Sequence, residues 1–582
     1  MTGSVTRLRG THLLKAGADL RWLRLNVLQP PSPAGQFSFS ALCTDLPGSS
    51  GTGHPLASFL LGQVERYAID LQADTIRNRA RVHEYFVQDE WRVHDRTTLN
   101  VGLRYTLNFP STETRNQAAA FNLTTRQLDF AGRDGVPRAL RRLHTHDLAP
   151  RLTVTQRIGT GTLVRAGYAL VWIDMTGITT PFTTPAFPFL QSIGQRSLDG
   201  VTPAFVLASG PTVEPLPLTP DAGLGQGVFA VDRRQGSGYA QQWHAGIDRS
   251  LPRAITARVA YVGSTITRLG VPESNLNQLT VEQLALGASL QQRVPNPYFG
   301  QIPRSSSLGD PTIPLAQLLR PFPQFTTVSL YRHNVGRSLY HGLTASLDRR
   351  WRAGLAATVS YTRSRLLDDA SSVFDASILT GPQTTAPVAD AFDRRRDRDV
   401  SSGDMPHVLV ASGVWTVPAG PGRARQWTGW RGWLGHNWTI AGILTLQSGL
   451  PVAVTQAINY NAFAGFSVQR PNLVGIPELP APERTTARWF NTEAFAVAPA
   501  FTLGNASRNP VRGPDVRTLD LALVREVPLG TRRRLDLRLE IFNALNRPVY
   551  GPPNGVFGSA AFGSITTAGD PRVMQLAVRA QF

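Results

Sequence analysis

Alternating apolar and polar residues recur from one end of this 582-residue chain to the other. In residues 99–107, apolar side chains occupy the odd positions, and polar residues or glycine occupy the even positions. Because successive side chains of a strand point to opposite faces, this period of two predicts strands with one apolar and one polar face. The pattern returns at 14–22, 163–172, 243–251, 343–347, 357–364, 438–447, 535–541 and 574–582. The sequence therefore predicts an all-β fold.

Short turns separate some of these strands, and long segments separate others. Residues 157–162 and 349–354 contain glycines that tolerate the positive φ of tight hairpins. The long segments are rich in Pro, Gly, Ser and Thr, and they span 176–238, 270–337, 368–405 and 454–515. Such loops are uncommon in compact soluble domains, where the median is about 4 to 6 residues. Short turns alternating with long loops are typical of outer-membrane barrels.

Hydropathy is consistent with strands that cross a membrane. No stretch of about 18 apolar residues occurs, so a membrane-spanning helix is not expected. A barrel strand needs only about 10 residues, and alternate ones are polar, so a mean hydropathy of -0.14 fits. We therefore predict a large antiparallel transmembrane β-barrel of about 14 to 18 strands with long extracellular loops.

The cost of placing charge in lipid predicts which face is wet. An arginine on the lipid face near the bilayer midplane costs about 2 to 4 kcal/mol, so polar strand residues should face the lumen. The candidate lumen-facing residues are Gln88, Glu90, Arg104, Arg538 and Arg579. Tryptophans at strand ends should lie at headgroup level, with packing in an ordinary protein core as the alternative. These are Trp91, Trp172, Trp415, Trp433 and Trp438.

The last alternating run ends at the last residue. Met574, Leu576 and Val578 are followed in register by Phe582. Bacterial barrels tend to finish on an aromatic residue preceded by apolar residues at every second position. We interpret these four residues as the C-terminal signal for the barrel-assembly machinery.

The chain carries a formal net charge of +19, and Lys15 is its only lysine. The arginines are scattered, and the one dense run, Asp393–Asp399, carries its own acids. No basic helix or base-stacking motif is recognised, so we do not expect nucleic-acid binding. Lining of the lumen, loops that face anionic lipopolysaccharide, or codon bias explain the charge equally well. The expected partners are outer-membrane lipid and lipopolysaccharide.

Patterns for catalysis or metal binding are sparse. His144, His146 and Asp147 could be written as a metal cluster, but no further ligand stands at a fixed spacing from them. A polar loop is therefore the preferred interpretation. No serine-hydrolase elbow, zinc-binding helix motif or phosphate-cradling loop is recognised. We therefore predict no enzyme activity, no cofactor and no metal site.

The acidic run invites a calcium interpretation. Asp393–Asp399, with Asp368 and Asp369 nearby, could bind calcium in an extracellular loop. The interleaved arginines would neutralise these acids, so a solvated network of ion pairs is the preferred prediction.

Longer strings of residues resemble a known family. The most specific are Tyr85–Arg92 (YFVQDEWR), Thr98–Tyr105 (TLNVGLRY) and Glu540–Asn546 (EIFNALN). They resemble the barrel of Oar-like TonB-dependent receptors of Gram-negative bacteria, over nearly the whole chain and in the same order. Further matching strings are 55–62, 149–151, 241–243, 260–264, 435–438, 447–451 and 571–572.

The resemblance implies a receptor with a signal peptide, a carboxypeptidase-regulatory-like β-sandwich, a plug domain and a barrel of about 22 strands. Met1–Gly10 has no apolar segment of a secretory signal, and no TonB box, sandwich or plug is recognised. We therefore expect residues 1–582 to be the receptor's barrel, incomplete at its N-terminal side.

The resemblance also implies a function. An outer-membrane location is expected, with transport of an unidentified substrate. The TonB complex would be a partner if the full-length protein has a plug. The alternative is a structural or adhesive surface barrel without active transport.

Overall fold

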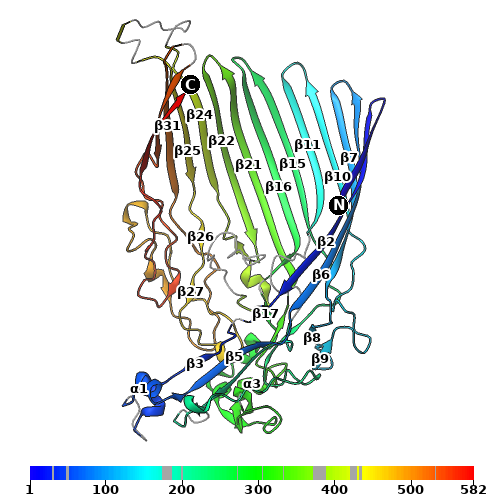
Figure 1. Cartoon of the computed structure of the whole chain (residues 1–582), viewed down its shortest axis with the longest axis vertical. Helices are drawn as coiled ribbons and strands as arrows, with labels where there is room; N and C mark the ends of the chain where they lie inside the picture. The colour runs from blue at the N-terminus through cyan, green and yellow to red at the C-terminus, as the bar shows by residue number, and fades with distance from the viewer. Residues whose placement is uncertain are drawn as a thin grey trace.

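The computed structural model describes the chain except for residues 29, 31, 47–51, 174–185, 198–200, 272, 305, 332, 371–387, 420–428, 431–434 and 531–532. One 16-stranded sheet dominates this part of the chain (Figure 1). Fifteen of its strands follow one another in space nearly as they do in sequence, and the short β23 (Asp399–Val400) pairs beside them with β22. In order across the sheet, these strands are β1 (Thr2–Arg9), β2 (His12–Val27), β6 (Ile76–His94), β7 (Thr97–Glu113), β10 (Leu148–Ile158), β11 (Thr162–Ile173), β15 (Gly238–Leu251), β16 (Ile255–Gly270), β21 (Asn334–Arg352), β22 (Leu355–Asp368), β24 (His407–Thr416), β25 (Trp438–Gln447), β31 (Val516–Pro528), β32 (Arg534–Phe542) and β34 (Val573–Gln581).

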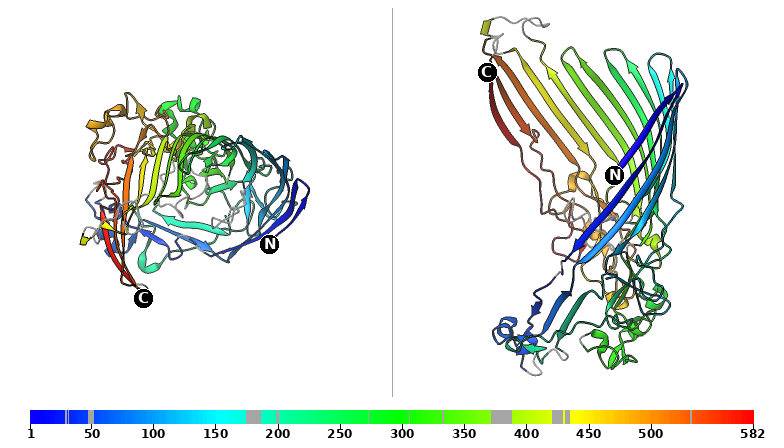
Figure 2. Two further views of the ribbon diagram at one scale, coloured as in Figure 1. Left: turned by 90° about the horizontal axis from the view of Figure 1, so that it is seen from above. Right: turned by 45° about the vertical axis from the view of Figure 1, so that its right-hand side comes forward.

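Every pairing in this sheet is antiparallel, and all the alternating runs found in the sequence lie within it. The predicted all-β class and strand number are therefore confirmed. The sheet curves into a wall that is open on one side, with β1 and β34 flanking the opening (Figure 2). Within the described residues, β1 pairs with β2 and β34 pairs with β32, but the two strands do not pair with each other.

The two ends of the wall differ as predicted. At one end, neighbouring strands are joined by short turns such as those at 159–161 and 353–354. Gly159 and Gly354 have φ of 61° and 78° there, the left-handed conformation that glycine adopts without steric cost. Most of the long connections leave the wall at the opposite end (Figure 1), whereas the connection between β24 and β25 leaves it at the short-turn end.

The described parts of the long connections are folded, which the sequence did not predict. One five-stranded sheet joins β17 (Ser274–Asn275), β20 (Thr327–Leu330), β14 (Gly227–Ala230), β8 (Ala119–Phe121) and β9 (Leu128–Phe130). It has its own buried apolar cluster, in which the Phe121 and Phe325 rings lie 4.7 Å apart. These partners are some two hundred positions apart in the sequence, so no local periodicity reveals them. We define these folded connections together as the loop assembly.

Other parts of the loop assembly are small. The α-helices whose bounds the structure describes are α1 (Pro55–Leu60), α2 (Val281–Leu284) and α3 (Leu315–Leu318). None of the described helices has the length and the apolar composition that a membrane span requires. The remaining strands are β3 (Gln36–Ser38), β4 (Gln63–Val64), β5 (Arg66–Gln72), β12 (Leu190–Arg196), β13 (Phe205–Val206), β18 (Arg293–Pro295), β19 (Thr312–Pro314), β26 (Pro451–Val452), β27 (Thr455–Gln456), β28 (Asn472–Leu473), β29 (Phe495–Ala496), β30 (Val511–Arg512) and β33 (Val556–Phe557).

Candidate functional site: the charged face of the wall and the loop assembly

Strand register assigns each side chain of the wall to one of two faces. In β21, Leu343, Ala345 and Leu347 are exposed on one face, which we define as the apolar face. Thr344 and Ser346 are half-buried on the other, which we define as the polar face. Since directly paired residues share a face, the register extends this assignment to every strand of the wall.

A ladder of opposite charges crosses four neighbouring strands on the polar face. Arg165 of β11 contacts Asp248 of β15 at 2.6 Å. Arg258 of β16 contacts Asp248 at 3.6 Å and Asp348 of β21 at 2.8 Å. Thr358 of β22 donates a hydrogen bond to the Asp348 carboxylate at 2.9 Å. Because both arginines remain 45% or more exposed, this ladder is hydrated and open to polar solutes.

A second charged group lies on the polar face near β2. Glu84 of β6 is approached by Arg21 at 3.3 Å and by Arg104 of β7 at 3.5 Å. The Arg104 guanidinium also lies 5.8 Å from the centre of the Phe86 ring. Asp19 of β2 lies directly opposite Glu84, so two arginines and two carboxylates share this position.

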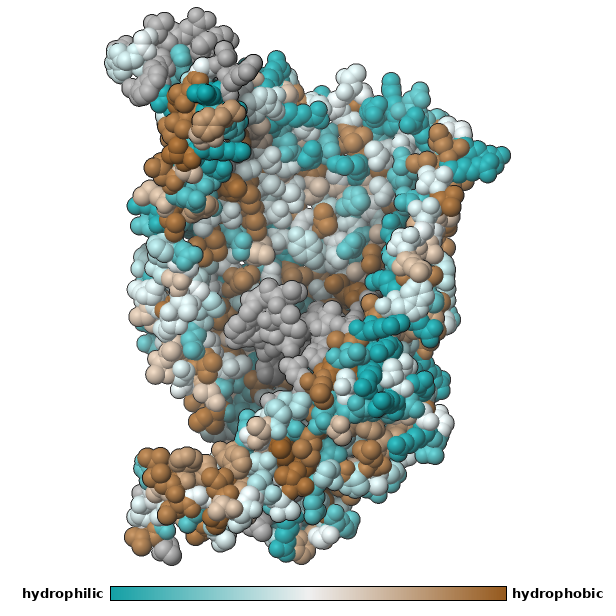
Figure 3. All heavy atoms as spheres, in the orientation of Figure 1, coloured by the Kyte–Doolittle hydropathy of each residue, from teal (hydrophilic) through white to brown (hydrophobic). Residues whose placement is uncertain are grey.

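All five residues predicted to face the lumen lie on the polar face. Gln88, Glu90 and Arg104 share the register of Glu84. Arg538 contacts Glu540 at 2.5 Å, and Arg579 is paired with Asp536. Through the open side of the wall, Figure 3 shows a concave surface that is mostly hydrophilic to intermediate. That the polar face borders lumen water stays a prediction.

The four C-terminal signal residues lie along the edge strand β34. Met574, Leu576 and Val578 project from the apolar face with 63%, 75% and 62% of their surface exposed, and Phe582 follows the strand. Recognition by assembly machinery stays a prediction.

The predicted tryptophans fall near the two ends of the wall, on its apolar face. Trp91, Trp415 and Trp438 lie near the short turns, where the Trp91 ring stacks on His12 at 5.3 Å. Trp172 lies near the loop assembly and donates a hydrogen bond from Nε1 to the Leu148 carbonyl at 2.9 Å. Trp433 lies outside the described residues.

Buried ion pairs join distant parts of the loop assembly. Arg508 pairs with Asp368, and Arg470 pairs with Asp397. Each of these four side chains is less than a tenth exposed, so the expectation of a solvated network is wrong in this respect. Arg394 pairs with Asp369 at 3.4 Å. The sequence correctly predicted ion pairing but missed the burial, because the arginines 470 and 508 come from a connection far along the chain.

Burial shifts the titration of one of these pairs. Loss of water raises the pKa of Asp397, an effect that the neighbouring Arg470 guanidinium opposes. Loss of water also lowers the pKa of Arg470, and here Asp397 acts against the shift. The mutual attraction thus compensates only part of the cost of burying both charges.

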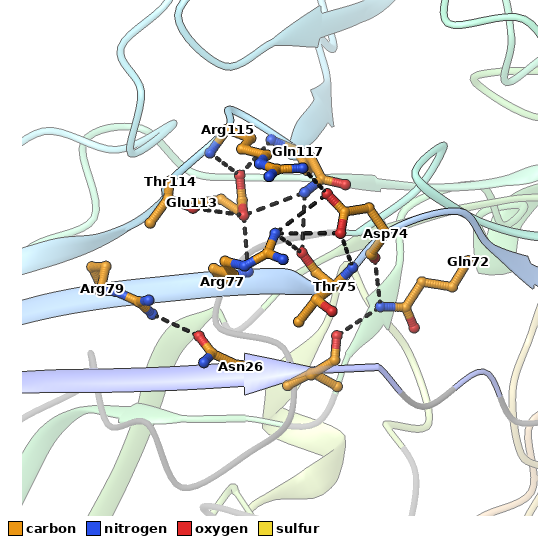
Figure 4. A network of polar contacts seen from close by, with 11 residues as sticks. Asn26, Gln72, Asp74, Thr75, Arg77, Arg79, Glu113, Thr114, Arg115 and Gln117 are labelled. Atoms are coloured by element: carbon orange, nitrogen blue, oxygen red, sulfur yellow. Dashed lines mark hydrogen bonds and ion pairs between the residues drawn. The ribbon is translucent and has the colours of Figure 1, made fainter.

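A further polar network fixes the point where β6 and β7 enter the loop assembly (Figure 4). The fully buried Glu113 accepts hydrogen bonds from the backbone N–H groups of Arg77 at 2.8 Å, Arg115 at 2.5 Å and Gln117 at 2.9 Å. Asp74 accepts from the Arg77 and Arg115 guanidiniums. The Arg77 hydrogen bond is the main reason why the pKa of Asp74 is lowered.

The histidine cluster is arranged as a hydrogen-bonded pair. His144 contacts the buried Asp147 carboxylate, and the His144 and His146 rings lie 5.7 Å apart. Among the residues that the structure describes, no group of three metal-ligating side chains is brought together.

Sequence reasoning missed the charge ladder. Each residue of the ladder occupies an ordinary polar position of its own strand, so the sequence of a single strand does not reveal the ion pairs. An acid and an arginine at matching polar positions of consecutive strands, as at Asp248 and Arg258, would have been the signal.

The chain matches the model of the outer membrane beta barrel domain family over residues 1–575. Among solved structures, the outer membrane transporter YddB from Escherichia coli shares 10% identity, over 100% of this chain and 53% of that chain, with a TM-score of 0.45. The ferripyoverdine receptor of the outer membrane of Pseudomonas aeruginosa shares 10% identity, over 99% and 47%, with a TM-score of 0.42.

The FrpB iron transporter from Neisseria meningitidis shares 11% identity, over 99% of this chain and 54% of that chain, with a TM-score of 0.43. The chain thus spans about half the length of these solved structures. No curated protein matches it.

Proposed function

Since the chain belongs to the outer membrane beta barrel domain family, we propose that residues 1–582 form one unit, the wall of a transport channel in the outer membrane. The proposal extends to import of a scarce or bulky solute with energy supplied through TonB when the wall acts within the complete receptor. The chain's work is binding and passage, and no covalent chemistry is assigned to it.

The observation that supports this proposal best is the charge ladder from Arg165 to Asp348. A wall whose only task is to anchor loops has no need of an exposed row of charges on its polar face. A channel does, because alternating cations and anions bind polar solutes weakly at several neighbouring sites, and weak sites in series allow passage.

Uptake by cells tests the proposal. Cells that produce the complete gene product, and cells that lack it, are grown in the same spent medium, and mass spectrometry measures which solutes each removes. We expect the producing cells to deplete at least one polar solute, and we expect deletion of TonB to abolish the difference. Asp248→Asn, which leaves two arginines of the ladder without their shared carboxylate, should slow that depletion. Arg249→Gln, an exposed change at the short-turn end, is the matched control and should leave depletion unchanged.

Depletion that is the same with and without TonB would refute energy-coupled import. If the producing cells deplete nothing but adhere differently to surfaces or to one another, the structural or adhesive barrel is the correct interpretation.

A further inference from the structure

A cluster of arginines lies on the side of the wall that faces away from the proposed transport path. Trp22 and Arg24 of β2 are paired with Arg81 and Arg79 of β6. Arg81 is paired in turn with Phe109 of β7. The register puts all five side chains on the apolar face, in line with Tyr85 and Val87 of β6 and with Val101 and Leu103 of β7.

The order of residues along β2 locates the cluster at the edge of the hydrocarbon. From the short turn toward the loop assembly, the apolar face shows Ala16, Ala18 and Leu20, then Trp22, and then Arg24. Apolar residues followed by an aromatic residue and then a cation mark the passage from acyl chains to headgroups. Trp22 is 51% exposed, as expected for a ring that contacts lipid. The cluster therefore lies at headgroup level on the side of the long connections.

The cluster lines a cavity of about 520 Å³. Four of the side chains around it are arginines, and the lining includes no aspartate or glutamate. The lining includes Trp22, Arg24, Arg79, Arg81, Phe109 and Arg141. Arg141 comes from the connection that follows β9 and donates a hydrogen bond to the Tyr331 carbonyl at 2.6 Å.

Three of the four charges in this cavity, those of Arg24, Arg79 and Arg81, are poorly compensated. Arg24 lies directly opposite Arg79, and like charges in such a pair destabilise a sheet. Arg79 donates to the neutral Asn26 side chain at 3.0 Å (Figure 4). It also donates to the Asn78 carbonyl at 2.7 Å. The Arg81 guanidinium lies 5.5 Å from the centre of the Phe109 ring. Within the described residues, no carboxylate forms an ion pair with Arg24, Arg79 or Arg81, in contrast to the ladder on the polar face.

We infer that this cavity binds the phosphorylated headgroup of a glycolipid in the outer leaflet. Guanidinium groups match phosphate oxygens in charge and geometry, and a dianion would remove the repulsion between Arg24 and Arg79. The acyl chains of the same lipid would lie along the apolar residues of β2, β6 and β7, on the short-turn side of Trp22 and Phe109. A soluble anion has no use for this apolar surface. The inference rests on the outer-membrane location of the chain and not on transport.

Binding of lipid A to the full chain in detergent tests the inference. The probes are lipid A with both phosphates, the same lipid without phosphates, and inorganic phosphate. We expect the wild type to bind the bisphosphorylated lipid at least about tenfold more tightly than the dephosphorylated one, since several charge-assisted hydrogen bonds are at stake. A large excess of inorganic phosphate should not displace the lipid. Displacement would overturn the lipid headgroup as the ligand and assign the cavity to free phosphate.

Two triple variants locate the site. Arg24→Gln, Arg79→Gln and Arg81→Gln together should remove the preference for the phosphorylated lipid. Arg249→Gln, Arg253→Gln and Arg350→Gln together remove the same charge from exposed positions at the short-turn end and should retain the preference. If the first triple variant keeps the wild-type preference, or if the wild type has none, the inference is wrong. Arg24→Gln alone serves in place of the first triple variant if that chain loses its heat-modifiable migration, and it should weaken binding of the phosphorylated lipid only.

Discussion

Replacement of Ala345 by arginine should destabilise the wall more than the same replacement at the neighbouring Thr344. Ala345 is exposed on the apolar face of β21, between Val259 and Tyr361 of the adjoining strands. It lies seven residues from the end of the strand at Arg352. At about 3.4 Å per residue and a strand tilt of about 40°, Ala345 lies about 18 Å from the short turn along the membrane normal. This depth is within an apolar band about 25 Å tall.

An arginine at that depth costs about 2 to 4 kcal/mol. Thr344→Arg points to the polar face, where the guanidinium stays hydrated. This variant loses only the contact between the Thr344 and Thr362 hydroxyls, which are 3.0 Å apart. Such a hydrogen bond contributes about 1 kcal/mol.

Urea titration of the chain folded into lipid vesicles, followed by heat-modifiable migration, measures both variants against the wild type. The free energy of unfolding should fall by about 2 to 4 kcal/mol for Ala345→Arg and by about 1 kcal/mol for Thr344→Arg. Equal losses, or a larger loss for Thr344→Arg, would refute the assignment of faces.

Three further predictions concern the ion pairs. Arg508→Ala leaves the Asp368 carboxylate buried without its cation, so we expect a loss of about 3 to 5 kcal/mol in urea unfolding, and replacement of both partners by apolar residues should restore most of it. Recovery of less than half of the lost free energy of unfolding by the double replacement would contradict this account of the pair. Asp248→Ala breaks contacts with two arginines that are 45% and 46% exposed, so the loss should be at most about 1 kcal/mol and should shrink in high salt. A salt-independent loss would show that the ladder is dry. The folded-state pKa of Asp74 is lowered, so its contribution to stability is present above the unfolded-state value of 3.8 and is lost as pH falls through the lower folded-state value. The wild type should therefore lose more stability than Asp74→Asn between about pH 5 and about pH 3, and identical pH profiles would exclude this role for Asp74.

The sequence predicted the wall well because strand periodicity is local. The alternation at residues 99–107 correctly gave β7 and both of its faces. The glycines at 159 and 354 correctly marked tight turns, because their positive φ is a property of one residue. The same local alternation correctly placed the five candidate lumen residues on one face, the polar face.

Features that depend on partners far along the chain were not predictable. The aromatic contact of Phe121 with Phe325 and the ion pair of Arg508 with Asp368 each join connections that no period relates. Burial of Arg508 to 1% of its surface contradicts the usual exposure of arginine, and only the folded loop assembly explains it. The opposition of Arg24 and Arg79 required the register of β2 on β6, which alternation within one strand does not fix.

If the wall spans the outer membrane, its apolar face contacts hydrocarbon and its polar face contacts water. Spin labels at five consecutive positions, 343 to 347, test it directly in vesicles, in a chain whose only cysteine, Cys43, is replaced by serine. We expect collisions with oxygen, which dissolves in lipid, to be high at 343, 345 and 347. Collisions with a water-soluble nickel complex should be high at 344 and 346. The reverse pattern, or no alternation between the two reagents, would contradict the claim.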